Sequence, residues 1–215
     1  MTSPTSILVI LVLAALAVPG CGGKIPETRY YQLAAPTATS QRHGDAVLVL
    51  ETLQTDAAYD DERIVYRANP YRLDYYNYHR WSAAPGTLIG NYLETAFERT
   101  GKFRAVVREI APNASVILAG RVVAIEEVDT AKQWTGRVVV ELSLTDARSG
   151  ESLWSEQIEE TEPLPTQTPE GLAKALSIAM ARIATKAAPV VADIADKQAA
   201  LHANQPATVG LTKGN

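Results

Sequence analysis

The chain has 215 residues, a formal net charge of −4 and a single cysteine. A mildly acidic chain without a Lys/Arg cluster is a poor candidate for binding nucleic acid or for electrostatic binding to anionic lipid. One cysteine excludes an intramolecular disulfide, while the length suffices for one ordinary domain with a hydrophobic core.

An apolar segment, Ile7 to Val18, stands near the start of the chain. It is too short for roughly 30 Å of hydrocarbon, which needs about 20 helical residues, but it fits the apolar region of a secretory signal. Val18-Pro19-Gly20-Cys21 follows and resembles the lipobox of bacterial lipoprotein precursors. We expect residues 1–20 to be a signal peptide and Cys21 to carry acyl chains. The alternative is a buried N-terminal helix that ends in an unmodified thiol.

The residues after Cys21 predict where the protein resides and how it is divided. Gly22 rather than Asp follows the cysteine, and by resemblance to lipoprotein sorting this favours the outer membrane, with the body on the periplasmic face. Residues 21–28 form the lipidated cysteine and a tether. We expect residues 29–198 to form one folded domain and residues 199–215 to form a flexible C-terminal tail.

The first half of the domain begins with short strands. Tyr30 to Leu33 and Ala46 to Leu50 are expected to be strands, separated by a loop over residues 34–44. Arg63 to Ala68 alternates apolar and polar residues, which is the period of a strand. Because Asn69-Pro70 interrupts the pattern before Tyr71 to Tyr78, the two segments predict a hairpin.

A helix is predicted from Pro85 to Phe103, with Ser82 as its N-cap and Gly101 just past its last turn. Its apolar residues recur on one helical face: Leu88, Ile89, Tyr92, Leu93, Ala96 and Phe97.

The second half predicts further strands and a second helix. Strands are expected at Phe103 to Val107 and Val116 to Ile125, then a hairpin of Arg137 to Thr145 with Ser152 to Ile158. Thr168-Pro169 begins a helix. The helix buries a stripe of Leu172, Leu176, Ala179, Met180, Ile183 and Ala187, and Pro189 kinks or ends it before a further helical piece at Val190 to Leu201. This order predicts an α+β two-layer sandwich: a mixed β-sheet with two main helices packed on one face.

Signatures of enzymatic chemistry are missing from the sequence. His43, His79 and His202 have no metal-ligand spacing, and no nucleophile elbow or phosphate-binding loop is present. The acidic residues 60–62 are interpreted as a solvated loop, and those from 151 to 162 as the exposed face of an edge strand. We expect no catalysis, no cofactor and no metal.

Six of the nine tyrosines lie between Tyr59 and Tyr78. Rings fall on both faces of the strand before Trp81, so one face is expected to serve something other than the core. Tyr, Trp and Arg are typical anchors of protein interfaces, and Arg gains attraction on an aromatic ring. The candidate partner-binding residues are Tyr66, Arg67, Tyr71, Arg72, Tyr75, Tyr76, Tyr78, Arg80 and Trp81. The alternative is an ordinary strand whose outer tyrosines are tolerated.

Several of these segments together resemble one family. They are Tyr30-Tyr31-Gln32-Leu33, Ile64-Val65-Tyr66-Arg67, Pro70-Tyr71-Arg72-Leu73, the stretch from Tyr75 to Trp81, and Pro85 with its helix. The chain is similar here to the ABC-type transport auxiliary lipoproteins, the PqiC-like family, from about Tyr30 to Ala188.

The resemblance implies a role in MCE-type lipid trafficking, without enzymatic activity or cofactor. The partners it implies are an MCE-domain protein that bridges the periplasm and an ABC permease and ATPase, and it makes a homo-oligomer conceivable. The expected function is therefore docking or receiving the periplasm-spanning component at the outer membrane. Two alternatives stay open: a carrier that holds lipid in a sheet–helix groove lined by the two apolar stripes, and a structural envelope lipoprotein.

Overall fold

The computed structural model of the protein describes residues 26–35, 37, 39–41 and 43–204. The expected signal peptide and Cys21 lie outside these residues. The strands are β1 (Arg29–Tyr31), β2 (Val47–Leu50), β3 (Gln54–Thr55), β4 (Arg63–Asn69), β5 (Arg72–Trp81), β6 (Ala105–Val107), β7 (Val116–Asp129), β8 (Trp134–Asp146) and β9 (Ser152–Pro163). The helices are α2 (Pro85–Arg99) and α3 (Pro169–Asn204).

A long antiparallel meander forms one side of the sheet. β7 pairs with β8 from Val116↔Asp146 to Asp129↔Trp134, and β8 pairs with β9 over nearly the same length. Among the described residues β9 has no second neighbour, so the acidic segment lies on an edge strand, as predicted. It does not form one exposed face, however, because Glu160 and Glu162 turn toward α3 and pair with Arg182. Charged side chains on an edge discourage pairing with other chains.

The other side of β7 is divided among three short strands in succession. β2 and β3 pair with β7 in parallel near its start and middle, and β4 pairs with it in parallel near its end. β5 then pairs antiparallel with β4, and β1 pairs in parallel with β5. The sheet is therefore mixed, and the predicted hairpin around Asn69-Pro70 is confirmed.

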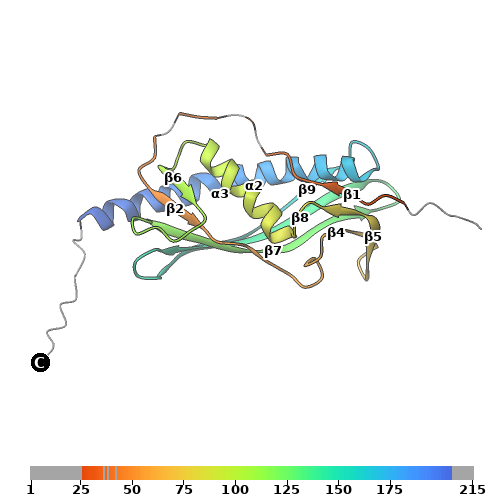
Figure 1. Cartoon of the computed structure of the whole chain (residues 1–215), viewed down its shortest axis with the longest axis horizontal. Helices are drawn as coiled ribbons and strands as arrows, with labels where there is room; N and C mark the ends of the chain where they lie inside the picture. Colours follow the sequence, from red (N-terminus) through yellow and green to blue (C-terminus); the bar gives the residue numbers. More distant parts are fainter. Residues whose placement is uncertain (1–25, 36, 38, 42, 205–215) are drawn as a thin grey trace, which may run out of the picture.

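Both helices lie over the same face of the sheet (Figure 1). A Cβ added to Gly136 of β8 would stand 3.1 Å from Cγ of Leu176 and 3.3 Å from Cβ of Ala175, both on α3. Residues alternating with Gly136 along β8 are buried beneath the helices, whereas the opposite face carries charged pairs such as Arg121 with Glu141. This arrangement confirms the predicted α+β class with two helices.

The helix boundaries agree with the sequence in part. Thr168 caps α3, because its Oγ1 accepts a hydrogen bond of 3.1 Å from the amide of Gly171. Gly101 has the positive φ of +68° expected after the first helix. That helix, however, ends at Arg99 rather than at Phe103. The expected N-cap is also wrong: Ala84 is the N-cap, and the amide of Ser82 donates to the carbonyl of Tyr31 instead.

Pro189 does not end its helix. α3 continues as one element of 36 residues to Asn204, so residues 199–204 are helical where a flexible tail is expected. Buried side chains stand on both sides of the proline, and the packing of Ala187, Ala188, Val191 and Ala192 holds the helix together across it. Tertiary packing of an apolar face outweighs the local penalty.

Candidate functional site

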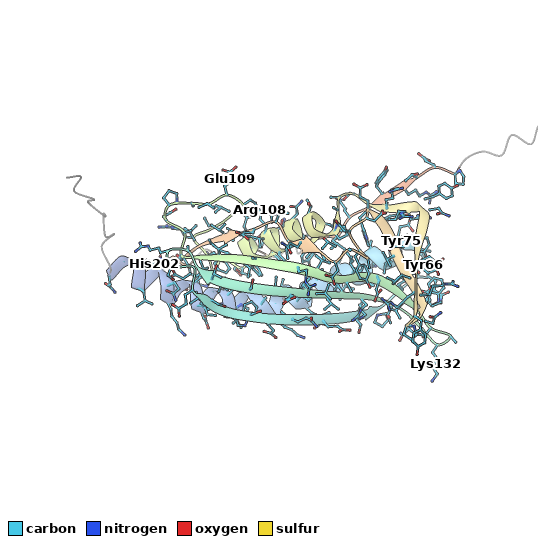
Figure 2. The ribbon with its side chains drawn as sticks, turned by 90° about the horizontal axis from the view of Figure 1, so that it is seen from below. Tyr66, Tyr75, Arg108, Glu109, Lys132 and His202 are labelled. Carbon is cyan, nitrogen blue, oxygen red and sulfur yellow. The ribbon has the colours of Figure 1, made fainter. Side chains whose placement is uncertain are left out.

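The sequence-predicted contact residues gather at one end of the molecule. We call this the tyrosine end: the β4–β5 hairpin, β1 beside it, and the turn from Thr130 to Gln133 between β7 and β8. Figure 2 shows Tyr66, Tyr75 and Lys132 at this end, and Arg108, Glu109 and His202 at the opposite one. β4 and β5 project the hairpin past the end of β7, so its side chains meet the last residues of that strand.

The nine candidate residues differ in exposure. Tyr71 and Arg72 are exposed, with 96 % of Tyr71 accessible, and Tyr78 is 38 % exposed. Tyr66, Arg67, Tyr75, Tyr76 and Arg80 are half-buried. Trp81 is 1 % exposed and belongs to the core. Only Tyr71, Arg72 and Tyr78 therefore present much of their side chain to a partner.

Glu126 is the centre of a polar network on the sheet face away from the helices. Its side chain has no exposure, yet Oε2 accepts hydrogen bonds from Tyr59 at 2.6 Å and from Arg67 at 2.8 Å, and Oε1 accepts one from Arg137 at 2.9 Å. Burial, with the Glu126 carboxylate beside it, raises the pKa of Tyr59 to about 12. The two guanidinium groups offset the cost of burying the carboxylate, so this network fastens β4 to β7.

Aromatic rings form a second cluster on the helix-covered face. The Tyr76 ring centroid lies 4.9 Å from that of Tyr66 and 5.5 Å from that of His79, and the His79 ring lies 5.6 Å from Tyr31. The Tyr31 hydroxyl and Nδ1 of His79 are 2.7 Å apart, within hydrogen-bond distance. The cluster joins β4, β5 and β1, so Tyr66 and Tyr76 support the hairpin from within.

Two carboxyl groups, the buried Glu127 and the half-buried Asp129, lie beneath this aromatic cluster. Tyr76 donates a hydrogen bond of 2.8 Å to Oε1 of Glu127, while Oε2 of Glu127 and Oδ1 of Asp129 have no hydrogen-bond partner. Burial, helped by the neighbouring Asp129, raises the pKa of Glu127 to about 7, against the opposing effect of the Tyr76 hydroxyl. Burial likewise raises the pKa of Asp129. Two carboxyl groups so placed favour holding a proton between them.

Cation–π stacking occurs in the hairpin, but the arginine is one that the sequence analysis does not single out. The guanidinium carbon of Arg63 lies 4.5 Å from the centroid of the Tyr75 ring. Arg63 is held by Asp61, which also lies 3.9 Å from Arg80. The acidic loop before β4 therefore positions the arginines of the hairpin base.

A surface pocket of about 420 Å³ separates the hairpin tip from the end of β7. Its walls include Asn69 and Pro70 on one side, Asp129 and Thr130 on the other, and the guanidinium of Arg137. By contrast, the apolar stripes proposed to line a lipid groove are packed core: Leu93, Phe97 and Leu172, for example, have no exposed surface. Among the residues the structure describes, no group of three or more His, Cys, Asp or Glu side chains is placed to bind a metal ion.

Sequence reasoning missed the residues that hold the hairpin in place. Glu126 and Glu127 are adjacent in a largely apolar strand, and a charged pair in such a position is a signal of buried partners. The sequence predicts only that Tyr30 lies in a strand, whereas in the structure it is 63 % exposed beside β5. The pairing partner of β1 lies 50 residues away, at His79 for Arg29, and no local pattern encodes it.

Comparison with known proteins identifies a matching family and similar solved structures. The model of the family described as ABC-type transport auxiliary lipoprotein component matches residues 31–188. A crystal structure of a Xanthomonas campestris protein described by the family model DUF330 superposes with a TM-score of 0.68 at 16 % identity, covering 82 % of this chain and 100 % of that one. An uncharacterized protein of known structure gives a TM-score of 0.63 at 13 % identity, covering 77 % of this chain and 99 % of that one. No curated protein matched in the corresponding comparison.

Proposed function

Because this chain belongs to the ABC-type transport auxiliary lipoprotein component family, we propose that it docks the periplasm-spanning, MCE-domain component of an intermembrane lipid transport system at the outer membrane. The family match over residues 31–188 is the observation that carries the proposal. The family is a transport auxiliary component rather than an enzyme family. The proposed role is therefore binding, not catalysis.

The anchor in this proposal is acylated Cys21. Val18-Pro19-Gly20-Cys21 supports it, and Gly22 supports retention at the outer membrane with the domain on the periplasmic face. Each buried CH₂ of an acyl chain contributes about 0.8 kcal/mol, so several chains on one cysteine anchor a protein durably. The family description as a lipoprotein component agrees with lipid attachment.

We assign partner contact to the flank of β5, through Arg72 and Tyr78. Both side chains are exposed, and the Arg72 guanidinium is fixed by a hydrogen bond of 2.7 Å to Asp74. Five further candidates act by support: Tyr66, Arg67, Tyr75, Tyr76 and Arg80 contact neighbouring elements and hold the flank in shape. A rigid aromatic surface binds with less loss of side-chain entropy than a mobile one.

Docking is better supported than direct lipid carriage. The helix stripes are buried against the sheet, so core side chains fill the place where a lipid groove is proposed. The pocket beside the hairpin, at about 420 Å³, has the size of sites that take drug-sized ligands, about 300–1,000 Å³, and is small for a two-chain phospholipid.

Site-specific photo-crosslinking in whole cells tests the proposed partner. A photoreactive residue at Tyr78 on the β5 flank is compared with one at Ile178 on α3, which has similar exposure (38 % and 41 %). We expect an adduct with an MCE-domain protein from position 78 and none from position 178. Recovery of the protein without any MCE-domain partner, in outer-membrane fractions where it is abundant, contradicts the proposal.

A further inference from the structure

The exposed aromatic and aliphatic side chains of the described residues are segregated. Among the described residues, the exposed large aromatic side chains all lie at the tyrosine end: Tyr30, Tyr71 and Tyr78. Ile110, which is 83 % exposed, follows Arg108 and Glu109 at the opposite end (Figure 2), and Ile178 lies on α3. Tyrosine, with an apolar ring and a polar tip, is the residue type enriched at membrane–water interfaces.

The β7–β8 turn extends this aromatic end. The pocket beside the hairpin joins Asn69 and Pro70 to Thr130, so Tyr71 at the hairpin tip and the turn lie at the same end of the sheet. Lys132 in the turn is exposed, and Trp134 directly after it is half-buried. Trp and Lys are also common at the level of phospholipid headgroups.

The chain leaves the domain toward Cys21 at this same end. β1 pairs in parallel with β5, with Arg29 opposite His79, so the residues that precede Arg29 lie at the same end of the molecule as the β4–β5 hairpin (Figure 1). Five peptide units separate Pro26 from Cys21. At no more than about 3.6 Å per residue they reach at most about 18 Å, less than the depth of a small domain.

We propose that the tyrosine end rests on the phospholipid headgroups of the membrane that holds the anchor, with Tyr30 and Tyr71 as its contacts. The inference rests on the proposed acylation of Cys21 and adds an orientation to it. The exposed cations Arg29 and Lys132 lie at this end, as do the exposed acids Glu27, Glu62 and Glu170. The contact is carried by the rings and the short tether.

A single thiol probe measures the orientation. The full-length acylated protein is placed in nanodiscs of phosphatidylethanolamine and phosphatidylglycerol, and an environment-sensitive fluorophore is attached to Tyr71→Cys or, as the matched control, Ile110→Cys. Because Cys21 is the only native cysteine and is acylated in this sample, the introduced thiol is the only free one. Quenching by iodide is compared with that of the same labelled chains carrying Cys21→Ser.

Anchoring is expected to reduce iodide quenching several-fold at position 71, with a blue-shifted emission, and to leave position 110 unchanged. Equal quenching at both positions overturns the inference. Protection at position 71 that needs an added MCE-domain protein, and is missing in nanodiscs alone, assigns Tyr71 to a protein contact and also overturns it. Mass spectrometry of the N-terminal peptide separates the two proposals. An acylated chain in which position 71 is exposed to water refutes only the orientation. An unmodified Cys21 refutes the anchor and the orientation together.

Discussion

The hydroxyl of Tyr76 donates a hydrogen bond of 2.8 Å to the carboxyl group of Glu127 and thereby joins the β4–β5 hairpin to the central strand β7. Asp129, with its own pKa raised by burial, lies beside this bond. The stability of the tyrosine end is therefore coupled to the protonation of the buried Glu127 and its neighbour Asp129.

Glu127→Gln should remove a pH dependence of folding. The pKa of Glu127 rises from 4.5 to about 7 on folding, chiefly through burial. A carboxyl group whose pKa is higher in the folded state contributes stability that is complete below the unfolded value and is lost as pH rises through the folded one. The free energy of unfolding of the wild-type protein should fall by a few kcal/mol as pH rises from 4.5 past 7. Urea titrations at several pH values measure this slope.

Glu127→Gln keeps the hydrogen bond from Tyr76 while losing the charge, so its slope over the same range should be markedly flatter. Glu109→Gln is the control, because Glu109 lies on the surface at the opposite end of the molecule (Figure 2). Parallel slopes for the wild-type and Glu127→Gln proteins would show that this carboxyl group does not titrate in the folded state.

Glu126→Ala should destabilise the protein far more than Glu141→Ala. Glu126 has no exposure and is bound by Arg67 and Arg137, whereas Glu141 binds Arg121 on the same sheet face with 43 % of its side chain exposed. Breaking a buried ion network costs about 3–5 kcal/mol, and an exposed pair about 1 kcal/mol or less. Equilibrium unfolding of the two variants gives the comparison. Equal losses would mean that the Glu126 network contributes no more than a surface pair.

Pro189→Ala should raise stability by about 1–3 kcal/mol, because proline in a helix interior lacks the amide hydrogen and crowds the preceding turn. Pro189 is exposed and lies within the continuous helix α3. Val190→Ala, at the neighbouring exposed position, serves as control and should change stability by about 0.5 kcal/mol or less. Denaturant midpoints report both. A loss of stability in Pro189→Ala would show that the helix requires a bend there.

Cys21→Ser should leave the fold intact and abolish function, since residue 21 precedes the described domain and the proposed anchor is its acyl group. Circular dichroism of the soluble product checks folding, and complementation of a deletion strain checks function. Full complementation at the normal level of expression would refute the anchoring argument.

The sequence predicts the elements of this fold well where the signal is local. The period of two before Asn69-Pro70 and the stripe from Leu172 to Ala187 give the correct hairpin and helix. The cap at Thr168 and the positive φ at Gly101 follow from residue type alone.

Long-range relationships are what the sequence does not reveal. The strand that is predicted to end at Ile125 continues to Asp129, because Glu126 and Glu127 bind partners on β4, β5 and β8. One of these partners, Tyr76, is more than fifty positions away in the sequence. Burial also depends on distant residues, so the sequence from Tyr66 to Trp81 does not show that Tyr71 is exposed and Trp81 is buried.

The continuous helix α3 determines how far the protein extends from its tyrosine end. At about 1.5 Å per residue its 36 residues extend about 54 Å along the long axis of the molecule (Figure 1). With the tyrosine end in contact with a bilayer, Asn204 and the loop that contains Ile110 would lie some tens of ångströms from the headgroups. Anything that meets the protein there meets it well inside the periplasm, out of reach of the lipids at its base.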